Sequence, residues 1–160
     1  CCLLGSRRGE VQRHVVPFRT AIENVAKATP GLVCVLPTVQ NLIDEVHAFA
    51  EGLPCRSIVV AGGDDKYDAM AASNVALAAS GTVTLELSMA GVPTVVAYRM
   101  AFLTYVLGKP LINVAYANLI NLILDKPIIP EFLQTRCIKF VKRLILTMIR
   151  FVNMHFTMRE

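Results

Sequence analysis

Apolar and polar positions follow two patterns that alternate along the chain. Five short apolar runs are separated by longer segments in which apolar residues recur every three or four positions. The first pattern predicts β-strands and the second predicts amphipathic helices. The predicted strands are 1–4, 32–36, 57–61, 75–79 and 94–98. The predicted helices cover about 10–28, 38–51, 65–73 and 82–90.

This order of elements predicts an α/β fold, a Rossmann-like parallel sheet flanked by helices. The strands are almost continuously apolar, which is typical of a sheet buried on both faces. Pro17 lies inside the first predicted helix and should kink it or delay its start. Gly- and Pro-containing segments at 29–31 and 62–65 predict turns. Beyond Tyr98 the alternation weakens, and 102–125 predicts one or two apolar helical stretches.

Length and composition narrow the class of protein. A chain of 160 residues suits one domain with a real core. It is 54% hydrophobic, yet no apolar run reaches the roughly 18 residues that a membrane span needs. It begins with Cys1 and Cys2, without Met or a signal-peptide pattern, so we expect a piece of a longer protein. Five cysteines without ligand spacing predict neither a disulfide framework nor a zinc site, and they fit the reducing cytoplasm.

Basic residues are concentrated at the C-terminal end of the chain. Residues 1–134 hold ten Lys and Arg against eleven Asp and Glu, whereas 135–160 hold six against one. We therefore predict one domain over 1–134 and a basic, apolar tail over 135–160. On a helix, most basic residues of the tail share one face and apolar residues cover most of the remainder, a pattern typical of helices that lie on anionic lipid. A frameshifted, meaningless translation is the alternative account of this tail.

Two junctions between a predicted strand and the next helix are rich in small polar residues. They are Gly-Ser-Arg-Arg-Gly-Glu at 5–10 and Ser-Gly-Thr at 80–82. Ligands of open α/β sheets bind beyond the carboxyl ends of the strands, where such loops lie. Backbone N–H groups and an arginine in these places suit a phosphate group. Ordinary helix capping by Ser80 or Thr82 is the alternative explanation of the second junction.

Glu86 interrupts the apolar stretch that follows the second junction. It lies four residues after Thr82, so both side chains share one face of the predicted helix. A carboxylate in this place can accept hydrogen bonds from two ribose hydroxyls, as the acidic residue of dinucleotide sites does by a different route. The alternative is a solvated glutamate that interacts with the helix dipole.

Other polar residues give weaker indications. His14, His47 and His155 share no ligand spacing, and we expect surface or helix-capping roles for them. The adjacent pair Asp64 and Asp65 fits a helix N-cap better than a metal site. We therefore predict no metal-binding or catalytic role for these residues.

Four segments together resemble the lipid-A-disaccharide synthase family of GT-B-type glycosyltransferases. They read LLGSRRGEV, ALAASGTVTLELSMAGVPTVVAYRM, NLINLI and PEFLQ, and they occur in order from about Leu3 to Gln134. The resemblance is to the C-terminal nucleotide-sugar-binding domain, so it implies the C-terminal half of a GT-B fold. Leu4 and Ile120 depart from the family pattern, which has proline at both places.

The resemblance implies a reaction, its substrates and its place in a Gram-negative cell. Diacylglucosamine would pass from UDP-2,3-diacylglucosamine to 2,3-diacylglucosamine 1-phosphate, forming the lipid A disaccharide and UDP at the cytoplasmic face of the inner membrane. It implies no cofactor, no metal and no nucleic-acid partner. The family carries its acceptor surface and catalytic carboxylate in an N-terminal domain, so the catalytic residue stays unassigned and this chain alone is expected to be inactive. Another UDP-N-acetylglucosamine-using GT-B enzyme, or a non-catalytic truncated domain, is the alternative.

The resemblance also implies which residues bind the donor. Ser80, Gly81 and Thr82 would hold the diphosphate, and Glu86 would accept the ribose hydroxyls. The residues expected to line the phosphate side are Gly5, Ser6 and Arg7. The residues expected to shape the rest of the donor pocket are Tyr98, Arg99, Asn121 and Gln134.

Overall fold

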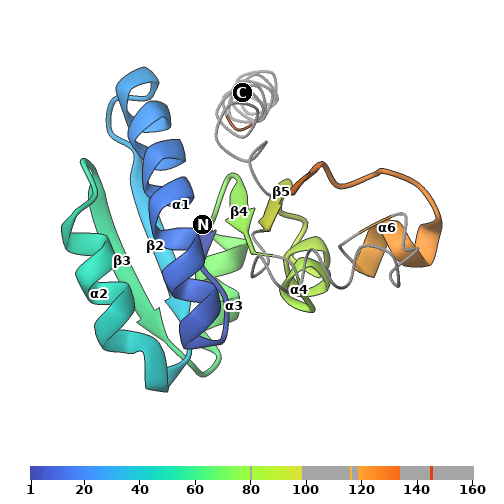
Figure 1. Cartoon of the computed structure of the whole chain (residues 1–160), viewed down its shortest axis with the longest axis horizontal. Helices are drawn as coiled ribbons and strands as arrows, with labels where there is room; N and C mark the ends of the chain where they lie inside the picture. Colours follow the sequence, from blue (N-terminus) through green and yellow to red (C-terminus); the bar gives the residue numbers. More distant parts are fainter. Residues whose placement is uncertain (80, 99–115, 117–118, 134–144, 146–160) are drawn as a thin grey trace.

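A computed structural model describes residues 1–79, 81–98, 116, 119–133 and 145 of the chain. Strands and helices alternate in it, and every strand pairing is parallel, so the predicted α/β class is confirmed (Figure 1). The strands are β1 (Cys2–Leu3), β2 (Val33–Thr38), β3 (Arg56–Ala61), β4 (Ala76–Ala78), β5 (Thr94–Tyr98) and β6 (Glu131–Leu133). The helices are α1 (Arg8–Ala28), α2 (Ile43–Glu51) after a 3-10 turn at Gln40–Leu42, α3 (Asp65–Ala71), α4 (Val83–Met89) and α6 (Leu119–Leu124).

The strand order places the first strand in the middle of the fold. β1 pairs with β4, which continues to β5 and then to β6, while β2 pairs with β3 in a second ladder. Because β2 also lies against β1, the strands follow one another in the order 3-2-1-4-5-6. This is the order of dinucleotide-binding folds, in which the chain reverses direction between the first and fourth strands and ligands bind at that switch point.

Alternating residues of the central strands point to opposite faces, and helices cover both. Cys2 faces the core beneath α1 and α2, together with Phe18 and Phe49. Leu3 faces the second core, where Met70 of α3 meets Leu87 of α4. This two-sided burial explains why the strands are almost continuously apolar.

The structure confirms the five predicted strands and the four predicted helices, with ends shifted by at most a few residues. Strand β6 was not predicted, because it has three residues and starts with a charged one, Glu131. Strand β3 is only partly buried, because it forms the edge of the order and Ile58 remains 39% exposed. Most of the predicted helical region 102–125 lies outside the described residues, and α6 forms its end.

The expectation that Pro17 delays the first helix is wrong. Helix α1 begins at Arg8 and contains Pro17 as a buried residue. Proline removes one helical hydrogen bond. Burial of apolar residues on both sides of it, among them Val11, Phe18 and Ile22, holds the helix together across that gap.

Of the three histidines expected to have surface or capping roles, His14 does not have one. His47 is exposed, as expected, and His155 lies outside the described residues. The His14 side chain is buried, and its Nδ1–H donates a 3.0 Å hydrogen bond to the Leu4 carbonyl. Its ring lies 5.2 Å from the ring of Phe18 and 5.6 Å from that of Tyr98. His14 thus joins α1 to the loop that follows β1.

Burial lowers the pKa of His14 below its ordinary value of 6.5, despite the opposing hydrogen bond to Leu4. The unfolded chain therefore takes up this proton at a higher pH than the folded chain. The free energy of unfolding should fall as the pH drops below about 6.5, and the loss should be complete below the folded pKa. Chemical denaturation at pH 7.5, 6.5 and 5.5 measures this fall, which should be smaller in His14→Gln. The control His47→Gln changes an exposed histidine and should keep the parent's slope, and a parent-like slope in His14→Gln would contradict the assignment.

Candidate functional site

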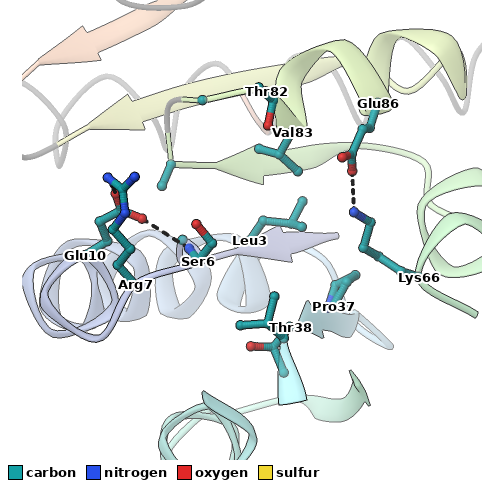
Figure 2. Close-up of a pocket in the computed structure, with 14 residues that line it drawn as sticks. Leu3, Ser6, Arg7, Glu10, Pro37, Thr38, Lys66, Thr82, Val83 and Glu86 are labelled. Atoms are coloured by element: carbon teal, nitrogen blue, oxygen red, sulfur yellow. Dashed lines mark hydrogen bonds and ion pairs between the residues drawn. The ribbon is translucent and has the colours of Figure 1, made fainter. Parts of the chain in front are cut away.

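A pocket of about 350 Å³ lies beyond the carboxyl ends of β1, β2 and β4. Four segments line it: the loop between β1 and α1, the end of β2, the start of α3, and the junction between β4 and α4 (Figure 2). The first and last of these are the two small-residue junctions noted in the sequence. They meet because β1 and β4 are hydrogen-bonded neighbours, although they are far apart along the chain. The pocket therefore occupies the switch point of the fold.

The loop after β1 turns sharply and folds back onto α1. Gly5 has a φ of +123°, and a Cβ atom there would lie 2.8 Å from Cβ of Glu10. The Ser6 N–H donates a 3.1 Å hydrogen bond to Glu10 Oε2. Arg7 Nη1 lies 3.6 Å from Glu10 Oε1, and the Arg7 side chain is 84% exposed. A phosphate bound here would thus lie beside an amide and an arginine that both contact Glu10.

Glu10 is a pocket residue that sequence reasoning missed. The available signal was its place three residues after Arg7, the residue before the first turn of α1, where a glutamate commonly reaches back to the preceding backbone. In Figure 2 Arg7 and Glu10 lie together on one side of the pocket. Because the Arg7 side chain is exposed and lies 3.6 Å from Glu10, their ion pair contributes little free energy, and a phosphate can compete for Arg7.

The junction after β4 presents a glycine and a threonine to the pocket. Gly81 has a φ of +140° and open space where a side chain would be, so the backbone conformation rather than crowding favours glycine. Thr82 stands at the N-cap position of α4, but its hydroxyl makes no capping hydrogen bond. Instead the hydroxyl of Thr84 donates to the Gly81 carbonyl at 2.8 Å. The capping alternative therefore does not describe Thr82, and Ser80 lies outside the described residues.

Glu86 faces the pocket from α4, on the same side as Thr82, as its spacing predicts. It is not a freely solvated glutamate. Its Oε2 lies 2.6 Å from Lys66 Nζ, and the two side chains are 27% and 25% exposed. Figure 2 shows the two side chains pointing toward one another, one from α4 and the other from α3. Sequence reasoning missed Lys66, because only the packing of α3 beside α4 brings it there.

The end of β2 forms the remaining wall, which sequence reasoning also missed. Pro37, Thr38 and Val39 line the pocket there. Thr38 is 5% exposed, and its hydroxyl has no hydrogen-bond partner among the described residues. A buried hydroxyl without a partner costs free energy, so this group is available to a ligand or to water.

Two of the expected donor-binding residues lie outside the lining of this pocket. Tyr98 ends β5 and packs against His14. The buried side chain of Asn121 binds the loop before β6: it donates to the Ile129 carbonyl at 2.6 Å and accepts from the Ile129 N–H at 2.8 Å. It also donates to Glu131 at 2.8 Å. These bonds assign Asn121 a structural role in shaping the chain that leads to Gln134.

Arg99 and Gln134 lie outside the described residues, so their expected roles remain predictions. Within the described part of the chain, no three His, Cys, Asp or Glu side chains are grouped so that they could hold a metal ion. Asp64 occupies the N-cap position of α3, where its carbonyl accepts the N–H groups of Tyr67 and Asp68.

Known proteins match this chain over most of its length. The family model described as LpxB, lipid-A-disaccharide synthetase, matches residues 1–147. A lipid-A-disaccharide synthase of Rhodospirillum centenum is 44% identical over 151 residues, which are 94% of this chain and 37% of that protein. The corresponding synthase of Nitrobacter winogradskyi is 41% identical over 136 residues, 85% of this chain and 34% of that protein.

The chain therefore spans a little over a third of the length of these curated relatives. The family match continues beyond Gln134, where the motifs recognised in the sequence end, into the basic segment. Only Ile145 is described there, and it packs in the core with Cys2 and Ile22. The match also covers every described segment that lines the pocket. The chain belongs to the lipid-A-disaccharide synthetase family.

Proposed function

We propose that the pocket binds the uridine diphosphate part of a nucleotide-sugar donor. The phosphates lie between Ser6 and Arg7 on one side and Gly81 and Thr82 on the other. The ribose hydroxyls are accepted by Glu86, with Ser80 completing the phosphate loop. The observation that carries the proposal is the meeting of these two junctions, which carry the family resemblance, in one pocket at the switch point of the sheet.

In the whole enzyme this site would serve the transfer of diacylglucosamine from UDP to a monosaccharide lipid phosphate. The leaving group is UDP, and backbone amides with Arg7 stabilise the charge that develops on it. Tyr98, Arg99 and Gln134 stay assigned to the sugar side of the donor by the family resemblance, and Asn121 acts indirectly by holding the loop before β6. The family match favours this reaction over those of other UDP-N-acetylglucosamine-using enzymes.

Calorimetric titration of the chain with UDP tests the proposal. We expect saturable binding that is tighter than binding of either uridine or pyrophosphate, because UDP alone reaches both the ribose and the phosphate sides of the pocket. A Gly81→Val variant, which forces a branched side chain into a left-handed backbone conformation, should bind UDP more weakly. Failure of UDP to bind, or UDP binding unchanged by Gly81→Val, would contradict the proposal.

We also propose that the basic segment 135–160 contacts the anionic surface of the membrane that supplies the lipid substrates. No helix in the described part of the chain has the length and apolar character needed to cross a bilayer. Any contact through this segment would depend on its six Lys and Arg residues.

Replacing Lys139, Lys142 and Arg143 together by Gln should reduce sedimentation with vesicles that contain anionic lipid. The expected reduction is about 1 kcal/mol of binding free energy per removed charge near the surface. These substitutions are preferable to deletion, because Ile145 belongs to the core. Zwitterionic vesicles provide the control, and equal sedimentation of parent and variant with anionic vesicles would contradict membrane contact by this segment.

A further inference from the structure

Lys66 lines the pocket, yet the proposed donor contacts do not use it. Its Nζ lies 2.6 Å from Glu86 Oε2, the carboxylate assigned to the ribose. Among the described residues, Glu86 has no second ion pair and no hydrogen bond through its side chain. Lys66 is therefore the one described residue that restrains this carboxylate electrostatically.

The position of Lys66 is itself restrained. Its Nζ lies 4.8 Å from the centre of the Tyr67 ring, within the range of a cation–π contact. Helix α3, which carries Lys66, packs against α4 through fully buried Met70 and Leu87. The core therefore holds α3 beside α4 and keeps the backbones of Lys66 and Glu86 close enough for the two side chains to pair.

The charges that line the pocket are balanced in two pairs. Arg7 lies beside Glu10, and Lys66 lies beside Glu86, so the lining has no net charge. A diphosphate carries negative charge, and an unpaired Glu86 would repel it across the pocket. An ionised carboxylate offers about four lone-pair sites, so Lys66 can neutralise Glu86 and leave acceptor sites for hydroxyl groups.

We propose that Lys66 is a positioning and specificity residue for the ribose of the donor. It holds the Glu86 carboxylate toward the pocket and cancels its repulsion of the diphosphate, so one site can accept both a hydroxyl pair and a phosphate pair. Lys66 thus acts through Glu86, whereas a lysine that bound the phosphates directly would act independently of Glu86. The inference rests on the proposed binding of uridine diphosphate.

Calorimetry with UDP and 2′-deoxy-UDP tests the inference in the parent chain and in Lys66→Met, Glu86→Gln and the double variant. The parent should prefer UDP by about tenfold or more, the value of one hydrogen bond to a charged group. Lys66→Met should bind UDP about 10- to 100-fold more weakly and lose most of that preference. The double variant should bind UDP about as well as Glu86→Gln alone, because a neutral glutamine no longer repels the diphosphate.

Two further variants keep the test decisive. Lys27→Met removes the same charge from an exposed position at the end of α1 and should behave like the parent. Lys66→Arg keeps the positive charge and should retain most of the preference for ribose, and thermal unfolding of each variant shows that it is folded.

Three outcomes would overturn the inference. If the double variant lost UDP affinity by the product of the two single-variant factors, Lys66 would be a direct phosphate ligand. If Lys66→Met kept the parent's preference for UDP over 2′-deoxy-UDP, Lys66 would not act on the ribose. Both leave the proposed function intact, since the parent still binds UDP. Absence of UDP binding in the parent would overturn the proposed function and this inference together.

Discussion

Replacing Glu86 by alanine should weaken UDP binding by about 30- to 700-fold, which corresponds to a loss of about 2–4 kcal/mol for two hydrogen bonds to a charged group. Binding of pyrophosphate should not weaken, because that ligand has no ribose. Calorimetric titration with both ligands therefore separates the ribose side of the pocket from the phosphate side.

Glu51→Ala is the matched control for this experiment. Glu51 ends α2, is exposed and does not line the pocket, so its removal changes the net charge equally without touching the site. Equal UDP affinity in the parent and in Glu86→Ala would remove Glu86 from the site. Equal weakening of UDP and pyrophosphate would assign Glu86 to the stability of the pocket and not to the ribose.

A protein that consists only of these 160 residues should bind UDP but form no disaccharide. Sugar transfer needs an acceptor hydroxyl that is held in line and loses its proton as the new bond forms. General-base assistance alone contributes about 10²- to 10⁴-fold in rate, and positioning contributes several kcal/mol more. The family resemblance assigns both to residues outside this chain, which spans little more than a third of its relatives.

The measurement supplies UDP-2,3-diacylglucosamine and 2,3-diacylglucosamine 1-phosphate to the purified chain and follows UDP release and disaccharide formation. A full-length relative of the family is the positive control. Saturable UDP binding without product is the expected result. Robust product formation by the 160-residue chain would mean that the catalytic base lies within it. The assignment of the base to residues outside this chain would then be wrong.

The sequence predicted most of the fold because apolar periodicity reports directly on burial. Strands such as β5, whose first four residues are all buried, are visible as β-branched runs whatever their neighbours are. The short strand β6 has no such run, and its place beside β5 depends on pairing between Val96 and Glu131 that no local pattern reveals. The burial of His14 was missed for the same reason, because its partner Leu4 lies on another element.

The residues of the candidate site also include some that the sequence predicted and some that it did not. Gly5, Gly81 and Glu86 could be predicted because each follows a recognisable strand and has a local reason to be there. Lys66 and Thr38 could not, since α3 and β2 carry no ligand-like pattern, and only tertiary packing brings them to the pocket. Residues that follow a recognisable strand can therefore be predicted from the sequence, whereas residues that tertiary packing brings to the pocket can be found only in the structure.

The pairing of β1 with β4 has a consequence for the order of folding. β2 and β3 are joined by a single helical crossover, so they can pair early at a small cost in loop-closure entropy. The ladder between β1 and β4 joins Cys2 to Leu77 and closes a much longer loop for only two residue pairs. Because non-local contacts form slowly, we expect the two halves of the pocket to meet late, and the proposed affinity for UDP to arise only when folding is nearly complete.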